Sequence, residues 1–181
     1  LYTKIKTASL HAPMAAAFNE GENEFIQSLH KAILGKKAKY NCAAHAFNKP
    51  GTATAELVGG NLCLLAHIIG TPSDINTKNK ILFIEDIGEQ IYNTDRLLYQ
   101  LKRSGKLANL AGLIVGGFTD TKDTDRPFGK TVYEVIQEIT AEYNYPVAYG
   151  FPVSHGKENY ALKVGVNYTL KITKAKTQLS E

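Results

Sequence analysis

The sequence predicts an α/β fold in which a small parallel sheet is joined by an antiparallel β-ribbon. Three observations indicate this fold. Continuous apolar segments alternate with amphipathic helical patterns from residue 80 to residue 149, which is typical of right-handed crossovers in a parallel sheet. Segments in which apolar and polar residues alternate flank this region, and such alternation is typical of half-exposed strands. The composition is that of a globular protein, because 44% of the 181 residues are hydrophobic and 21% are charged.

The first part of the chain contains a short apolar segment and one helix. Residues 7–14 are apolar, with Pro13 near their end. Asn23 is of a residue type that caps helices, and it precedes apolar residues at helical spacing up to residue 34. Gly35 is expected to end this helix.

Two alternating segments and a short helix follow. Residues 40–47 and 52–58 alternate and are separated by a Pro-Gly turn signal, so we expect them to form an antiparallel pair. Residues 59–61 are then expected to open an apolar helix over residues 62–69. At the other end of the chain, residues 167–174 alternate and predict one more antiparallel strand.

The middle of the chain is the most regular part. Residues 80–84, 111–115 and 146–149 are short apolar runs that predict buried strands. Helical patterns over residues 90–103 and 131–143 connect them. Strand, helix, strand, helix, strand therefore predicts a parallel sheet with two crossovers.

Composition and spacing exclude several classes of function. The formal net charge of +4 is modest, and the lysines are scattered without a pattern of base-stacking aromatics, so no nucleic acid partner is expected. No apolar run approaches the roughly 20 residues of a membrane span, so no membrane partner is expected. Cys42 and Cys63 form no CxxC motif, lie at no predicted strand end, and are interpreted as buried thiols. The histidines lack metal-ligand spacing, so no metal or other cofactor is expected.

Residues with acid–base chemistry follow the predicted parallel strands. Glu85 and Asp86 follow the first strand, the pair Gly116-Gly117 follows the second, and His155 follows the third. Working groups gather beyond the carboxyl ends of such strands, and a carboxylate can orient a histidine for proton transfer. The alternatives are that Glu85 is a neighbour of the N-cap of the following helix, and that His155 is structural or solvated. No serine stands in a Gly-framed turn after a buried strand, so the pattern indicates an acid–base half-site without its nucleophile.

An ordered set of motifs resembles the LD-carboxypeptidases, a family of serine peptidases that includes the muramoyltetrapeptide carboxypeptidases, with the microcin-immunity peptidases as relatives. The resemblance runs from about residue 10 to residue 165. Its motifs are Gly59-Gly60-Asn61-Leu62, Gly70-Thr71-Pro72, Ile84-Glu85-Asp86-Ile87-Gly88-Glu89, Asp95-Arg96-Leu97-Leu98 with Gln100-Leu101, Gly117-Phe118-Thr119, and Gly150-Phe151-Pro152 with His155.

The resemblance implies a three-layer β/β/α domain of the swivelling type, with a small central parallel sheet and a second, antiparallel layer. It implies that residues 1–14 follow an N-terminal domain that bears the serine, and that residues 15–181 form the C-terminal domain. Glu85 and His155 match the acid and the base of a Ser-Glu-His triad. Ala12 and Ser154 depart from the family pattern, which usually has glycine at both positions.

The activity implied is hydrolysis of the L,D-peptide bond that carries the terminal D-alanine of peptidoglycan tetrapeptides, a cytoplasmic step of cell-wall recycling. The partners implied are this peptide and the protein's own N-terminal domain, and a homodimer stays open. Gly60 and Asn61 are candidate substrate contacts, although a helix cap is the favoured interpretation of Asn61. Two alternatives remain: a microcin-immunity-like peptidase that cleaves peptide–nucleotide conjugates, and a swivelling domain in which His155 carries a phosphoryl group without a carboxylate partner.

Overall fold

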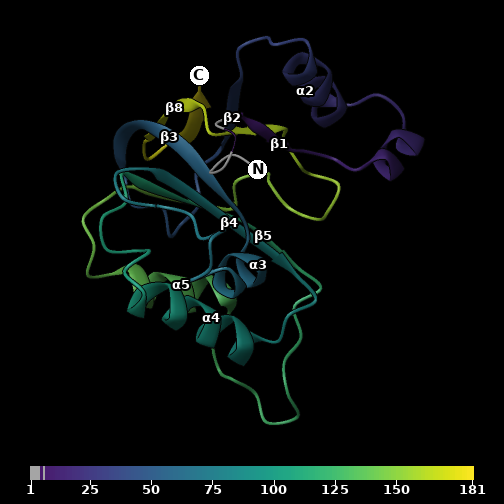
Figure 1. Cartoon of the computed structure of the whole chain (residues 1–181). Helices are drawn as coiled ribbons and strands as arrows, with labels where there is room; N and C mark the ends of the chain where they lie inside the picture. The colour runs from purple at the N-terminus through teal and green to yellow at the C-terminus, as the bar shows by residue number, and fades with distance from the viewer. Residues whose placement is uncertain (1–4, 6) are drawn as a thin grey trace.

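The computed structural model describes residue 5 and residues 7–181 of the chain (Figure 1). Its elements follow each other as β1 (Ser9–His11), a 3-10 helix η1 (Ala15–Glu20), α2 (Glu24–Ile33), β2 (Lys39–Ala43), β3 (Gly51–Asn61), α3 (Leu62–His67), β4 (Ile81–Ile87), α4 (Ile91–Arg103), β5 (Gly112–Thr119), α5 (Val132–Thr140), β6 (Val147–Tyr149), β7 (Leu162–Val164), β8 (Asn167–Ile172) and β9 (Lys176–Ser180).

The main sheet has seven strands in the order β2-β9-β8-β3-β4-β5-β6. The strands from the C-terminal half of β3 to β6 pair in parallel, and those from β2 to the N-terminal half of β3 pair antiparallel. The long strand β3 therefore belongs to both parts, and β1 and β7 form a separate antiparallel pair. This topology confirms the predicted α/β fold with a small parallel sheet and an antiparallel layer.

Two hydrophobic clusters separate the layers of the domain. One lies between the parallel strands and helices α3, α4 and α5, which Figure 1 shows together on one side of β4 and β5. The other lies on the opposite face, where Phe83 of β4 packs among residues of the antiparallel strands such as Tyr168 and Leu170. Successive side chains of β4 alternate between these clusters, because a strand points its side chains to opposite faces in turn.

Local sequence signals set the helix ends that were predicted. The Asn23 side chain accepts hydrogen bonds from the backbone N–H groups of Phe25 and Ile26, which satisfies two donors at the start of α2. Thr131 and Glu134 form a reciprocal capping box at the start of α5. The predicted opening of α2 at Asn23 is thus confirmed.

The predicted pairing of residues 40–47 with residues 52–58 is wrong. Strand β2 pairs with β9, and β3 pairs with β8 and β4. The reason is the length of β3: its first half pairs with the tail and its second half continues through Gly59 and Gly60 into the parallel sheet. Residues 59–61 are consequently the end of a strand, and the short helix begins at Leu62 as expected and ends at His67.

The C-terminal tail forms a hairpin, where one strand was expected. Strands β8 and β9 pair antiparallel around a turn in which the Thr173 hydroxyl donates to the Lys176 carbonyl and accepts from the N–H groups of Ala175 and Lys176. This turn contains neither glycine nor proline, so the sequence carried no conventional signal for it. The hairpin supplies the strands on which β2 and β3 pair.

Candidate active site

The alternation of β4 sends the two acids at its end in opposite directions. Glu85 follows Phe83 by two residues and shares its face of the sheet, whereas Asp86 shares the face of Ile84, on which α3 packs. The loop after β6 carries His155 to the Glu85 face. Strands β4 and β6, on either side of β5, thus bring a carboxylate and a histidine to one edge of the parallel sheet, as the sequence predicted.

The predicted contact between Glu85 and His155 is present. Nδ1 of His155 lies 2.6 Å from Oε2 of Glu85, while the His155 side chain is 36% exposed and that of Glu85 is fully buried. Because Glu85 occupies Nδ1, this nitrogen carries the proton in the neutral imidazole and Nε2 is the basic atom. Nε2 forms no hydrogen bond with the described residues, so it is free to act on another group.

The environment of Glu85 opposes its negative charge. Burial raises the pKa of Glu85 above its ordinary value of 4.5, although the hydrogen bond from His155 acts in the opposite direction. Its second oxygen, Oε1, is buried and has no hydrogen-bond partner among the described residues. A carboxylate in such a place gains when a positive charge develops on its histidine partner, so the pair suits proton transfer at His155.

The glycine pair at the end of β5 makes room for the loop that holds His155. A Cβ at Gly116 would lie 2.2 Å from the Val153 carbonyl oxygen, and one at Gly117 would lie 2.6 Å from the Ser154 Cβ. The Gly117 N–H also donates to the Val153 carbonyl, at 2.9 Å. The two glycines therefore let the His155 loop pack directly on the strand next to Glu85.

Hydrogen bonds within the loop fix the position of His155. The Ser154 hydroxyl accepts from the Gly156 N–H and donates to the Glu158 carbonyl, both at 3.0 Å. These two bonds tie the backbone on the C-terminal side of His155 to Ser154. The Ser154 N–H donates to Oδ1 of Asn159, at 3.4 Å. Serine in place of the usual glycine is thus accommodated at position 154 and anchors the loop.

Asp86 organises the other side of the sheet edge. Its carboxylate accepts hydrogen bonds from the Asn61 side chain at 2.6 Å, the Cys63 N–H at 3.1 Å and the Ile87 N–H at 2.9 Å. Oδ1 of Asn61 accepts from the Leu64 N–H at 3.0 Å, so the favoured interpretation of Asn61 as a helix cap is confirmed. The function of Asp86 as the anchor of α3 was missed by sequence reasoning, although an acid directly after a buried strand was its signal.

Gly60 and Asn61 lie beside the central strand, in register with Ile84 and Glu85. A Cβ at Gly60 would meet no atom within 4 Å, so the backbone at this position is open to a ligand. The structure places both candidate substrate contacts at the same sheet edge as the Glu85–His155 pair. Their role in binding stays a prediction.

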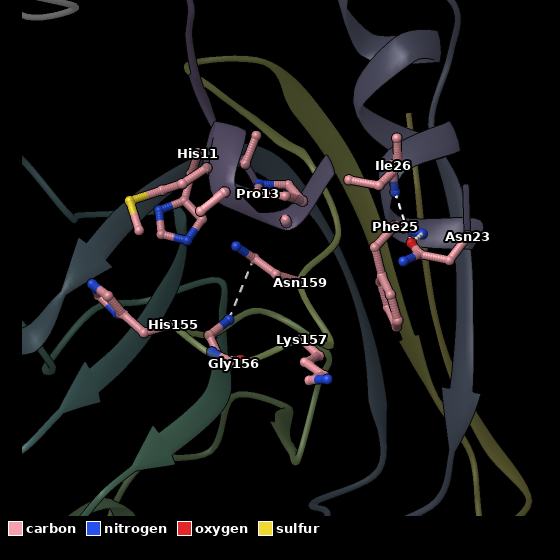
Figure 2. Close-up of a pocket in the computed structure, with 14 residues that line it drawn as sticks. His11, Pro13, Asn23, Phe25, Ile26, His155, Gly156, Lys157 and Asn159 are labelled. Atoms are coloured by element: carbon pink, nitrogen blue, oxygen red, sulfur yellow. Dashed lines mark hydrogen bonds between the residues drawn. The ribbon is translucent and has the colours of Figure 1, made fainter. Parts of the chain in front are cut away.

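A cavity of about 420 Å³ lies beside His155 (Figure 2). Besides that residue it is lined by residues from β1, η1, the start of α2 and the His155 loop. Among them His11 stacks edge-on against Phe83 with its Nε2 buried and unpartnered among the described residues, and burial lowers its pKa. Asn159 and His11 were not singled out as site residues from the sequence, because His11 showed no metal-ligand spacing and Asn159 stood in none of the quoted motifs.

The cysteines differ in part from expectation. Both are unpaired with each other and only half-buried, and burial raises the pKa of Cys42 to about 11. Cys63 does lie at the sheet edge, because its N–H donates to Asp86 at the end of β4.

Within residues 5 and 7–181, no cluster of His, Cys, Asp and Glu side chains is arranged to hold a metal ion. None of the helices in this same part of the chain combines the length and apolarity of a membrane span.

Comparison with protein families matches residues 54–170, more than half of the chain, to the C-terminal domain of the LD-carboxypeptidases. A probable murein peptide carboxypeptidase of Bacillus subtilis is 39% identical over 132 residues, which are 73% of this chain and 41% of that protein. The matched region contains both Glu85 and His155. The chain thus spans less than half of the length of this relative.

Solved structures show the same relationship. The muramoyltetrapeptide carboxypeptidase from Oxalobacter formigenes superposes with a TM-score of 0.88 at 29% identity, over 98% of this chain and 62% of that one. The microcin C7 self-immunity protein of Escherichia coli is 30% identical over 167 residues, which are 88% of this chain and 46% of that protein.

Proposed function

Since the chain belongs to the LD-carboxypeptidase family and matches its C-terminal domain, we propose that it is part of a serine carboxypeptidase. The enzyme would cleave the L,D-peptide bond before the terminal D-alanine of peptidoglycan tetrapeptides. Its relatives named as murein peptide and muramoyltetrapeptide carboxypeptidases support this substrate class. From the resemblance to the family's recycling enzymes we also propose that the reaction takes place in the cytoplasm, in the recycling of cell-wall peptides.

In the proposed mechanism His155 moves the proton and Glu85 stabilises the resulting cation. Nε2 of His155 takes the proton of a serine hydroxyl as the serine oxygen attacks the scissile carbonyl carbon. His155 then gives this proton to the amine nitrogen of the leaving D-residue as the C–N bond breaks and an acyl-enzyme remains. Water hydrolyses the ester, with His155 again accepting and returning a proton. The buried Glu85 carboxylate holds Nδ1 and favours the imidazolium in each step.

The nucleophilic serine is proposed to lie outside these 181 residues, in an N-terminal domain that residues 1–14 follow. Two observations support this division. The serine of the His155 loop uses its hydroxyl within that loop, and no serine of the described residues is hydrogen-bonded to His155. The relatives are also longer than this chain, since it covers 62% of the Oxalobacter enzyme. The chain alone is therefore expected to be inactive.

The contact between His155 and Glu85 is the observation that carries the proposal. Its test is release of the terminal residue from an L,D-tetrapeptide by the full-length protein, followed by chromatography and mass spectrometry. We expect release of D-alanine from the D-terminated peptide and none from the matched peptide that ends in L-alanine. Equal release from both peptides, or from neither, would contradict the proposal.

The microcin C7 self-immunity relative supports a second candidate, cleavage of a peptide–nucleotide conjugate. One aromatic side chain, Phe25, lines the cavity beside His155 and provides a ring surface for a base. The two candidates differ in substrate and share the residues of the pair. Comparing kcat/KM for a tetrapeptide and for an aspartyl–nucleotide conjugate separates them, and we expect the tetrapeptide to be preferred.

The phosphohistidine alternative is contradicted by the geometry. It required a His155 without a carboxylate partner, whereas Glu85 lies 2.6 Å from Nδ1.

A further inference from the structure

We propose that the cavity beside His155 is the subsite for the leaving residue, and that Asn159 binds the free terminal carboxylate there. The cavity would also admit terminal D-residues with side chains larger than that of alanine. This inference rests on the proposed function, and it assigns a specificity-determining role to residues outside the Glu85–His155 pair.

The direction of proton transfer determines where the leaving residue must bind. His155 must deliver its proton to the leaving nitrogen, so that nitrogen has to come within hydrogen-bond reach of Nε2. The terminal residue, which carries this nitrogen, must then occupy space next to the imidazole. The cavity of about 420 Å³ has His155 and Gly156 in its wall and provides such a space.

Asn159 offers a hydrogen-bond donor to this cavity. The residue is 7% exposed and lines the cavity, where Figure 2 shows it between His155 and Phe25. Its Oδ1 accepts the Ser154 N–H, which identifies the other terminal atom as the NH₂ group. This NH₂ group donates to no atom of the described residues. Because Asn159 lines the cavity, this amide donor is available to a ligand with an acceptor such as a carboxylate.

The charge of the cavity wall also favours an anion. None of the described residues that line it is acidic, and Lys157 adds a positive charge. Oδ1 of Asn23 accepts the two N–H groups at the start of α2, so the NH₂ group of this side chain is directed elsewhere and provides a second amide donor at the wall. A carboxylate would therefore meet amide donors and, among the described lining residues, no acidic side chain.

The remaining wall is apolar and larger than alanine requires. It includes Pro13, Met14, Phe25 and Ile26, and the volume of about 420 Å³ lies within the roughly 300–1,000 Å³ of small-molecule pockets. Met14 is 71% exposed, so it covers the rim without filling the cavity. The wall would thus bury an aliphatic side chain of a terminal D-residue such as D-methionine.

The test uses Asn159→Asp in the full-length protein with two matched tetrapeptides, one ending in a D-alanine carboxylate and one in D-alaninamide. Aspartate keeps the oxygen that accepts the Ser154 N–H and replaces the amide donor with a second oxygen. We expect kcat/KM for the carboxylate peptide to fall about ten- to hundredfold, mainly through KM. The fold-decrease in kcat/KM for the carboxamide peptide should be at least tenfold smaller. A purely structural role of Asn159 would lower both rates equally, and that result overturns the inference.

A second pair of variants covers the case in which Asn159→Asp fails to fold. Met14 lies at the exposed rim, so Met14→Glu and its uncharged control Met14→Gln should both fold. We expect Met14→Glu to discriminate against the carboxylate peptide relative to the carboxamide peptide, and Met14→Gln to treat the two as the wild type does. The same effect on both peptides would place the terminal carboxylate elsewhere.

The wild-type controls separate this inference from the proposed function. No release of D-alanine by the wild-type protein would overturn both. Release of D-alanine together with equal sensitivity of the two peptides to each variant would overturn the subsite alone. Release of D-methionine with a kcat/KM within tenfold of that for D-alanine is expected from the apolar wall, and a loss beyond a hundredfold would contradict the assigned size.

Discussion

Nδ1 of His155 lies 2.6 Å from Oε2 of Glu85, although 70 residues separate the two in the chain. The parallel sheet brings them together, because Glu85 lies near the end of β4 and the loop after β6 carries His155. The acid is fully buried and the histidine is partly exposed, so one end of the pair is fixed and the other faces a reactant.

Replacing Glu85 with glutamine should stabilise the fold at neutral pH. Burial raises the pKa of Glu85 above 4.5, so the folded state binds a proton more tightly than the unfolded state. Wild-type stability is therefore lost as pH rises from 4.5 through the raised pKa, and Glu85→Gln removes this loss. Urea unfolding of both proteins should show a difference in free energy that grows above pH 4.5. A difference that is independent of pH would show that the carboxyl is not strained by burial.

The same substitution should lower activity in the full-length enzyme. Glutamine cannot supply the negative charge that stabilises the imidazolium, and loss of a buried acid of this kind costs about 10⁴-fold in kcat. Steady-state kinetics with the tetrapeptide measure it. A fall of less than about tenfold would remove Glu85 from the mechanism.

Two substitutions of His155 separate its role in proton transfer from its hydrogen bond to Glu85. His155→Gln can still donate to Glu85, so we expect activity to vanish while stability stays within about 0.5 kcal/mol of the wild type. His155→Ala leaves the buried carboxyl without its donor, and should also cost about 1–3 kcal/mol at neutral pH. Thermal unfolding and tetrapeptide turnover of both variants provide the comparison. Residual turnover in His155→Gln near the wild-type rate would rule out His155 as the base.

Substitutions of Gly117 and Ser154 should have non-additive effects on the free energy of unfolding. A Cβ at Gly117 would lie 2.6 Å from the Ser154 Cβ, so Gly117→Ala should destabilise by about 1–3 kcal/mol through overpacking. Ser154→Gly removes the obstructing atom, and the double variant should lose less stability than the sum of the single ones. A double-mutant cycle by denaturant unfolding measures the coupling. Simple additivity would mean that the loop moves away at no cost.

The site was predictable to the extent that it follows from strand ends. Glu85 directly follows the apolar run of residues 80–84, and His155 lies in the loop after the run of residues 146–149. Parallel strands bring such positions together at one edge of the sheet. Asn159 and His11 were not predictable in this way. Asn159 depends on a loop that folds back on its own Ser154 N–H, and His11 is placed by the pairing of β1 with β7, which joins distant parts of the chain.

The fold was predictable where packing is local and was not where pairing is distant. The crossovers from β4 to β6 carry clear apolar runs and helical periods. The pairing of β2 with β9 depends on a hairpin whose turn lacks glycine and proline, and β9 buries only Thr177 and Leu179 between more exposed neighbours. The double role of β3 likewise depends on its two partners, because its sequence does not mark where one ends and the other begins.

The most direct test of the account is D-alanine release from an L,D-tetrapeptide by residues 1–181 alone and by the same residues joined to the upstream domain. We predict no release by the first protein and release by the second, with His155→Gln abolishing it. Release by residues 1–181 alone would contradict the account, because it would place the nucleophile within this chain.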